Sequence, residues 1–98
     1  MAKYIVVHAY KKGKAPGDFW KYMEKEVPGL AKSMKAGLTP ARSLMTWNPL
    51  PYGRTDCFFC LWEADKPEDI IATLKGNADQ YVTSDIIKVD EIDWSKLA

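Results

Sequence analysis

The sequence is short of the residues that most often carry metal and nucleophile chemistry. It has one histidine, His8, and two cysteines, Cys57 and Cys60, in 98 residues. A structural zinc site needs about four such ligands, so this set is too small for one. The chain also lacks a GxSxG motif, a phosphate-binding loop, an HExxH motif and a matched pair of carboxylates. We therefore expect neither a metal ion nor a bound cofactor.

An excess of charge and a long apolar run are missing as well. Fourteen Lys and Arg face thirteen Asp and Glu, and a formal net charge of +1 creates no field that would draw nucleic acid or an anionic membrane. No stretch approaches the roughly 18 to 20 apolar residues that span a bilayer, and residues 1–14 lack the pattern of a signal peptide. We expect a cytoplasmic protein with reduced thiols and without a nucleic-acid or membrane partner.

What is present is the composition of a small globular protein. Hydrophobic residues make up 47% of the chain and charged residues 28%, a balance that differs from that of disordered sequences. The length suffices for one small hydrophobic core, so we expect a single domain over residues 1–98. Segments rich in β-branched and aromatic side chains indicate four strands, at residues 4–10, 41–47, 57–64 and 85–92.

Two helices are expected between these strands. The first should begin at Gly17 and end at Gly37, because apolar residues recur in it every three or four positions. Pro28 lies inside this pattern and should kink the helix or divide it in two. The second should begin near Pro67 and end at Gly76. Its buried face is predicted to consist of Ile70, Ile71 and Leu74.

The resulting order β-α-β-β-α-β predicts an α+β fold, the ferredoxin-like sandwich. In this fold two helices cover one face of a four-stranded antiparallel sheet, and residues 48–55 form the loop of a central hairpin. The expected strands are apolar on both of their faces, which is more than one covered face requires. We therefore expect a homodimer in which the uncovered faces of two sheets pack together.

Three passages carry a resemblance to a known family. They are the opening KYIVVHAY, the turn YGRTD and the strand-to-helix passage CFFCLWEADKPEDIIATL. Together they resemble the dimeric α/β-barrel proteins, in particular short members with no assigned activity, over nearly the whole chain. The resemblance implies a homodimer whose sheets enclose a cavity, on a scaffold that also serves antibiotic-biosynthesis monooxygenases, haem-degrading enzymes and lactone isomerases. The break at Pro28-Gly29 departs from the plain pattern, and fold analogy does not select among these chemistries.

The CFFC sequence at 57–60 suggests a redox or metal motif, but its place in a strand disfavours both. Successive strand side chains point to opposite faces, so Cys57 and Cys60 should face apart. A redox CxxC depends on a helix start that lowers the pKa of a thiol. Simple burial is the favoured interpretation, with Cys60, beside Trp62, still a candidate for a cavity wall.

A few other side chains are candidates for a site. His8 could act as a general acid or base or as a haem ligand, or it could be a half-buried histidine held by a neighbour. Tyr10 shares its strand face and offers a hydroxyl group. Arg42 could bind a carboxylate or phosphate, or it could be a solvated charge at a strand end. Trp47 and Trp62 are candidates for aromatic cavity walls, or for core or dimer-interface residues.

Two function hypotheses follow, and the residues leave open whether the chain is an enzyme. In the first, a dimer cavity lined by His8, Tyr10, Cys60 and Trp62 binds or transforms a small apolar or aromatic molecule, at most as a cofactor-independent monooxygenase. In the alternative, the chain is a non-catalytic dimerisation or assembly module without a pocket. RNA recognition is weaker, because CFFCLWEA lacks the basic residue and glycines of RNA-binding strands. A cavity with converging polar groups discriminates the first two.

Overall fold

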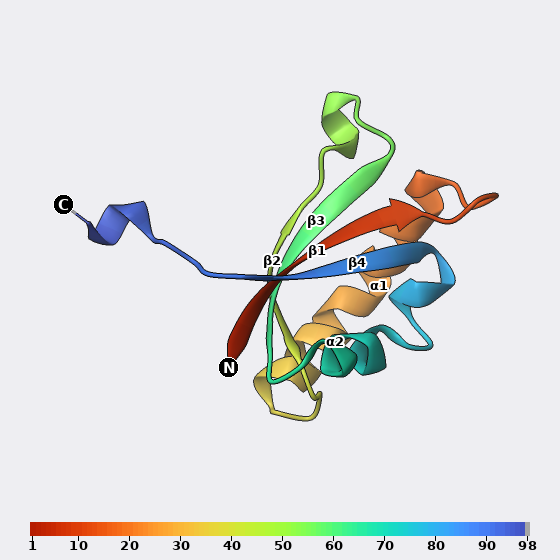
Figure 1. Ribbon diagram of the computed structural model, residues 1–98. Helices are drawn as coiled ribbons and strands as arrows, with labels where there is room; N and C mark the ends of the chain where they lie inside the picture. Colours follow the sequence, from red (N-terminus) through yellow and green to blue (C-terminus); the bar gives the residue numbers. More distant parts are fainter. Residues whose placement is uncertain (98) are drawn as a thin grey trace.

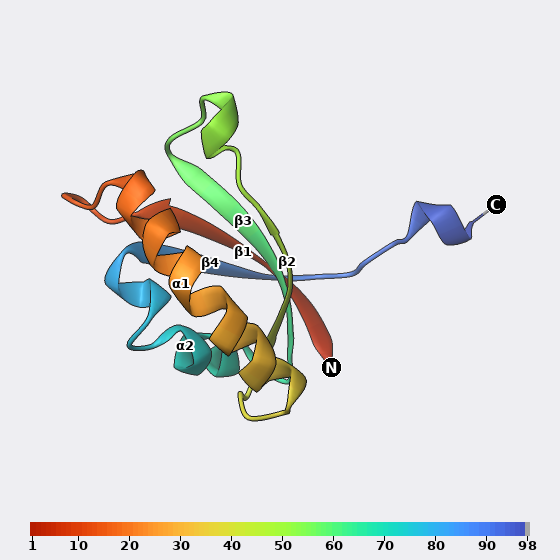
Figure 2. The same cartoon turned by 180° about the vertical axis from the view of Figure 1, so that it is seen from behind.

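Residues 1–97 are described by a computed structural model, in which two helices lie on the same side of one antiparallel sheet (Figures 1 and 2). The elements are β1 (Ala2–Tyr10), α1 (Pro16–Lys35), β2 (Arg42–Trp47), β3 (Cys57–Ala64), α2 (Pro67–Leu74) and β4 (Val82–Val89). Single 3-10 turns lie between these elements at Leu50–Tyr52 and Ala78–Gln80, and after β4 at Trp94–Lys96. Within residues 1–97, no helix combines the length and the apolar character that a membrane crossing requires.

The sheet has the strand order β2-β3-β1-β4, and neighbouring strands are antiparallel. Each helix connects two strands that lie on either side of a third, which is compatible with the expected ferredoxin-like order. The α+β class, the four-stranded antiparallel sheet and the two helices are therefore confirmed. Strand β2 carries an irregularity between Ser43 and Met45, where its register against β3 shifts.

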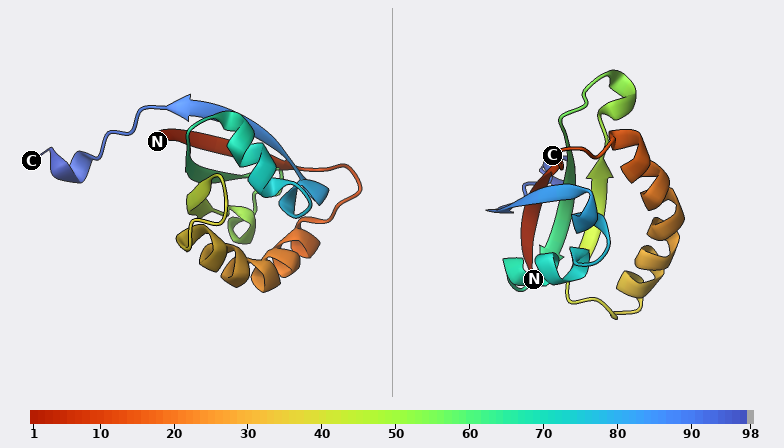
Figure 3. Two further views of the ribbon diagram at one scale, coloured as in Figure 1. Left: turned by 90° about the horizontal axis from the view of Figure 1, so that it is seen from below. Right: turned by 90° about the vertical axis from the view of Figure 1, so that its right-hand side faces the viewer.

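The two faces of the sheet have different surroundings. On the helix side, the register aligns Tyr4, Val6 and His8 of β1 with Trp62, Cys60 and Phe58 of β3, and all six side chains are buried. These residues form the core together with Phe19 of α1 and Ile70 of α2. The opposite side, which we call the open face, has no helix over it in residues 1–97 (Figure 3).

Helix α1 begins and ends where the sequence predicts. Pro16 occupies its first position, where a missing N–H costs nothing. At the other end, Gly37 has a positive φ of 73°, which a residue without a side chain adopts most easily. The Gly37 N–H donates to the Met34 carbonyl (3.1 Å) and the Leu38 N–H donates to the Ser33 carbonyl (3.0 Å), the paired bonds of a Schellman motif.

Of the two outcomes predicted at Pro28, a kink or a division, the division is wrong, because α1 continues through Pro28 as one helix of 20 residues. Pro28 and Glu24, one turn earlier, are both exposed. The Glu24 carbonyl, which lacks its helical partner, can therefore bond to water, and a gentle bend is enough to relieve the clash of the ring. Figure 3 shows α1 as a single bowed helix.

Two other expectations need correction. The last strand spans 82–89 rather than 85–92, because β4 can pair only where β1 offers a partner, from Tyr10 opposite Val82 to Lys3 opposite Val89. In α2, Ile70 and Leu74 are buried as predicted, but Ile71 is 56% exposed. A helix of only eight residues turns one narrow stripe toward the sheet, and Ile71 lies outside that stripe.

Candidate functional site

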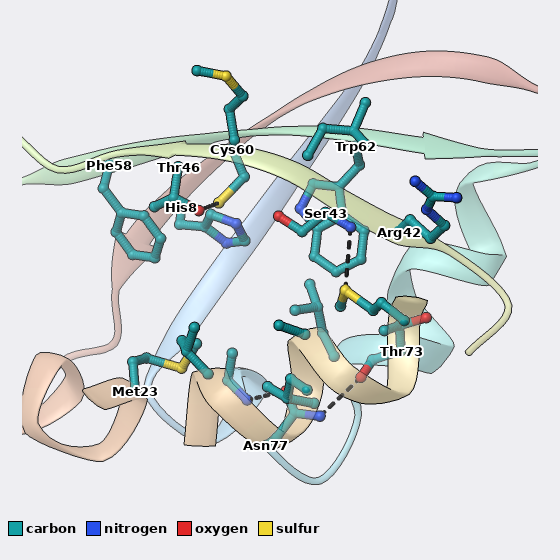
Figure 4. Close-up of a pocket in the computed structure, with 18 of the residues that line it drawn as sticks. His8, Met23, Arg42, Ser43, Thr46, Phe58, Cys60, Trp62, Thr73 and Asn77 are labelled. Atoms are coloured by element: carbon teal, nitrogen blue, oxygen red, sulfur yellow. Dashed lines mark hydrogen bonds between the residues drawn. The ribbon is translucent and has the colours of Figure 1, made fainter. Parts of the chain in front are cut away.

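A pocket of about 620 Å³ lies between α1 and the helix side of the sheet (Figure 4). Its volume is within the range of roughly 300 to 1,000 Å³ that is usual for small-molecule sites. The wall formed by the sheet includes His8 from β1, Ser43 and Thr46 from β2, and Phe58, Cys60 and Trp62 from β3. The end of α2 and the turn after it supply Thr73 and Asn77.

The pocket exists because α1 does not close onto the sheet. Phe19 at its first turn is the one side chain that the helix buries fully. Further along the same stripe, Met23, Leu30 and Met34 are half-buried and Val27 is 46% exposed, yet all four line the pocket. An apolar stripe that packed against the sheet would be buried. Here it is only partly buried: Met23 and Met34 contact the edge of the core and also line the pocket, and both are flexible side chains that can adapt to a shape.

His8 is held firmly on the sheet side of this pocket. Its side chain is 2% exposed and its ring stacks on Phe58, with 4.5 Å between ring centroids. Its Nδ1 lies 3.3 Å from the Thr83 carbonyl and 3.0 Å from the Ser84 hydroxyl. Burial lowers the pKa of His8 to about 4, against the weaker opposing effect of the Thr83 carbonyl. The imidazole is therefore neutral at neutral pH.

The thiol of Cys60 is neutral as well. Burial raises the pKa of Cys60, although Thr46 and Trp62 act in the opposite direction. The Thr46 Oγ1 and Cys60 Sγ atoms are 3.3 Å apart. The Trp62 Nε1 atom is buried and has no hydrogen bond of ordinary geometry within residues 1–97. This indole is an unpaired donor, a kind of group that is rare in folded proteins.

Charge is confined to one end of the pocket. Of the described residues that line it, Lys35 and Arg42 are the charged ones, and both belong to the end where α1 stops and β2 starts. The Arg42 Nε atom lies 3.4 Å from a Glu63 carboxylate oxygen, so its charge is already partly balanced. The Arg42–Glu63 pair is directly opposed in the β2–β3 register. The interior of the pocket carries apolar and neutral polar groups.

The structure brings only some of the predicted site residues together. His8, Cys60, Trp62 and Arg42 line the pocket, whereas Tyr10 and Trp47 do not. The Tyr10 hydroxyl accepts a hydrogen bond from Trp20 Nε1 (2.7 Å), so Tyr10 belongs to the aromatic core. Trp47 pairs with Phe59 on the open face. The two free cysteines face apart as expected, Cys57 beside Ala9 and Cys60 in the pocket.

The sequence predicts His8, Tyr10, Cys60 and Trp62 in a cavity between two sheets of a dimer, whereas the structure places three of them in a pocket of the single chain. His8, Cys60 and Trp62 project toward the helices, so the pocket they line is inside one chain (Figure 4). Alternation along a strand tells which residues share a face but not which face the helices cover. The apolar stripe of α1 can be read from the sequence, but its distance from the sheet, which leaves the pocket, cannot.

Within residues 1–97, no group of three or more His, Cys, Asp or Glu side chains is placed to hold a metal ion. Comparisons of the chain with protein-family models, with curated proteins and with solved structures find no match.

Proposed function

We propose that this protein binds a small, uncharged apolar or aromatic molecule in the pocket between α1 and the sheet. One observation carries the proposal: beyond Phe19, the apolar stripe of α1 is only partly buried and, together with the sheet, lines a pocket of about 620 Å³. A largely apolar pocket of this size, with a few polar groups in its wall, is typical of small-molecule sites. A pocket of this kind also disfavours the alternative of an assembly module without one.

The groups inside the pocket favour an uncharged ligand. His8 and Cys60 are both neutral at neutral pH, because burial lowers the pKa of the first to about 4 and raises the pKa of the second. Transfer of an ion into such surroundings is costly without a paired charge. Within residues 1–97, Lys35 is the basic residue of the pocket that has no ion pair, and it lies at the end of α1, so the interior suits an uncharged group.

The proposal is binding rather than acid-base catalysis. The Thr83 carbonyl can only accept a hydrogen bond, so the proton of neutral His8 belongs on Nδ1 and its Nε2 remains an acceptor. An imidazole with a pKa near 4 is a poor proton donor and a weak base at pH 7, because general catalysis is best when the pKa is near the working pH. His8 is therefore suited to orienting a hydroxyl or amide group of the ligand.

Fluorescence titration with a neutral aromatic probe, N-phenyl-1-naphthylamine, tests this proposal. We expect saturable binding at one site per chain. Leu30→Glu places a carboxylate on the pocket side of α1 and should weaken binding by about tenfold or more. Ile71→Glu makes the same change on α2 outside this pocket and should leave binding unchanged. Equal affinities for the two variants, with native circular dichroism, would refute the pocket as the site.

We further propose that the open face packs against a second copy of the chain, the arrangement of the dimeric α/β-barrel proteins that the sequence resembles. Cross-strand neighbours on this face are mostly apolar. They include Ile5, Val7, Met45, Trp47, Phe59, Leu61 and Ile87. Met45 and Trp47 are 51% and 44% exposed in the single chain. A contiguous apolar face of this kind is a common feature of association surfaces.

Light scattering after size-exclusion chromatography tests the homodimer. We expect twice the 11.1 kDa mass of one chain. Leu61→Glu, in the middle of the open face, should give the mass of one chain, whereas Tyr52→Glu, at a position that is 91% exposed on the hairpin, should stay dimeric. Probe binding should survive in the Leu61→Glu monomer, because the pocket belongs to one chain. A native protein that is monomeric at high micromolar concentration would contradict the dimer.

A further inference from the structure

Residues 90–97, which we call the arm, leave the body of the protein after β4. Figures 1, 2 and 3 show this segment extending away from the sheet and both helices. Three apolar side chains of the arm are largely in solvent: Ile92 is 66% exposed, Trp94 81% and Leu97 63%. The radius of gyration is 13.9 Å, whereas a chain of this length is expected to have about 12.6 Å. The arm thus offers apolar groups outside the core.

The arm is nevertheless folded locally. Asp93 caps a 3-10 turn at Trp94–Lys96 by accepting hydrogen bonds from both the backbone N–H and the hydroxyl of Ser95. Lys96 returns to Asp93 through a backbone hydrogen bond of 3.1 Å and an ion pair of 3.7 Å. Within residues 1–97, the charged contact between arm and body is Lys3 with Glu91, at 3.9 Å. A preformed turn that presents Trp94 to solvent is an arrangement suited to a partner.

We propose that the arm packs on a second copy of this chain, so that the two copies exchange arms across the dimer. This inference rests on the proposed packing of two open faces. The arm continues directly from β4, the edge strand of the open face, so a copy that packs on this face lies within its reach. The exposed Ile92, Trp94 and Leu97 would add apolar area to that interface.

Charge indicates how the copies are oriented. A two-fold axis parallel to the strands reverses the order β2-β3-β1-β4, so that β4 of one copy lies over β2 of the other. The end of β4 and the start of β2 are at the same end of the sheet, because Val89 is opposite Lys3 and Arg42 is opposite Glu63. The arm therefore emerges beside the partner's start of β2.

This orientation gives complementary contacts on both edges. The arm contains the acids Asp90, Glu91 and Asp93, and it meets the half-exposed guanidinium of Arg42 at the start of the other copy's β2. The exposed Ile87 of β4 covers the β2 side chains of the other copy. An in-plane axis perpendicular to the strands would instead place the two β4 strands face to face. Their mid-strand Asp85 carboxylates would then repel each other.

Sedimentation equilibrium of the full chain tests the exchange of arms. Trp94→Ser should raise the dimer dissociation constant by at least about tenfold. Tyr52→Ser, an equally exposed aromatic position on the hairpin, should leave it unchanged. Arg42→Glu should weaken the dimer, and Glu91→Arg in the same chain should restore part of the loss. Native circular dichroism of each variant verifies the fold.

Hydrogen exchange of residues 93–97 gives a second measurement that does not depend on a substitution. We expect their amides to be protected above the dissociation constant and to exchange freely below it. A dimer whose dissociation constant is insensitive to Trp94→Ser, or an arm protected equally at every concentration, would overturn the exchange of arms and leave the sheet dimer in place. A chain that stays monomeric at high micromolar concentration would overturn both.

Discussion

Acidification should destabilise this protein through His8, well before its carboxylates titrate. His8 is the one histidine of the chain and is 2% exposed. Burial lowers its pKa to about 4 in the folded protein, whereas an unfolded histidine has a pKa near 6.5. Below pH 6.5 the unfolded chain therefore binds more protons than the folded one. The stability that neutral His8 permits is present above pH 6.5 and is lost as the pH falls toward 4.

The size of the effect follows from these two pKa values. Between pH 7 and pH 5 the free energy of unfolding should fall by about 1.8 kcal/mol, and the full difference of about 3.4 kcal/mol is reached below pH 4. A small domain has a total stability of roughly 5 to 15 kcal/mol, so this loss is readily measured. Aspartates and glutamates contribute little in this window, because their usual pKa values lie near 4.

Urea unfolding at pH 7, 6 and 5, followed by circular dichroism, measures this dependence. The His8→Gln variant is the control, since its amide can still donate toward the Thr83 carbonyl but cannot gain a charge in this range. We expect the variant to be less stable at pH 7 and to lose less than about 0.5 kcal/mol on going to pH 5. Parallel slopes for the native protein and the variant would refute the buried, neutral state of His8.

Three further predictions concern the backbone and the thiols. In urea unfolding, Gly37→Ala should destabilise the fold by about 1 kcal/mol, because Gly37 has a positive φ. Gly29→Ala should instead stabilise the fold by about 0.5 to 1 kcal/mol, because Gly29 lies inside α1 with open space around it. Pro28→Ala should stabilise by about 2 kcal/mol by restoring a helical hydrogen bond, and an unchanged unfolding midpoint would contradict this. Cys57 and Cys60 are buried, so both should react with a thiol reagent at pH 8 only in denaturant; a fast-reacting thiol in the folded protein would contradict their burial.

Local signals in the sequence were enough to predict the fold. Proline at the start of each helix, Gly37 and Gly76 after their ends, and the β-branched runs each act within a few residues, so their effect can be read from the sequence. The wrong predictions concern features that depend on another element of the fold or on water. The start of β4 depends on where β1 offers hydrogen bonds, and the survival of α1 through Pro28 depends on its exposed side facing water.

The candidate site was predictable only in part. Alternation correctly grouped His8 with Tyr10 on one strand face and Cys60 with Trp62 on another. Alternation could not show that the helices cover the sheet face that carries all four residues, because a two-residue period does not tell which face of a strand is covered. The distance between α1 and the sheet also depends on tertiary packing, which local sequence patterns do not specify. Met23, Thr46 and the pocket residues other than His8, Arg42, Cys60 and Trp62 are therefore not predictable from the sequence.

The central claim is that the space beneath α1 is a binding site. Its most direct test is an NMR titration with N-phenyl-1-naphthylamine of protein that carries ¹³C in its methionine methyl groups. Met23 and Met34 line the pocket, whereas Met1 is 68% exposed at the start of the chain. We expect the methyl signals of Met23 and Met34 to shift together and to saturate at one probe per chain, while Met1 does not move. Unmoved Met23 and Met34 signals at a probe concentration that saturates the fluorescence would contradict the claim.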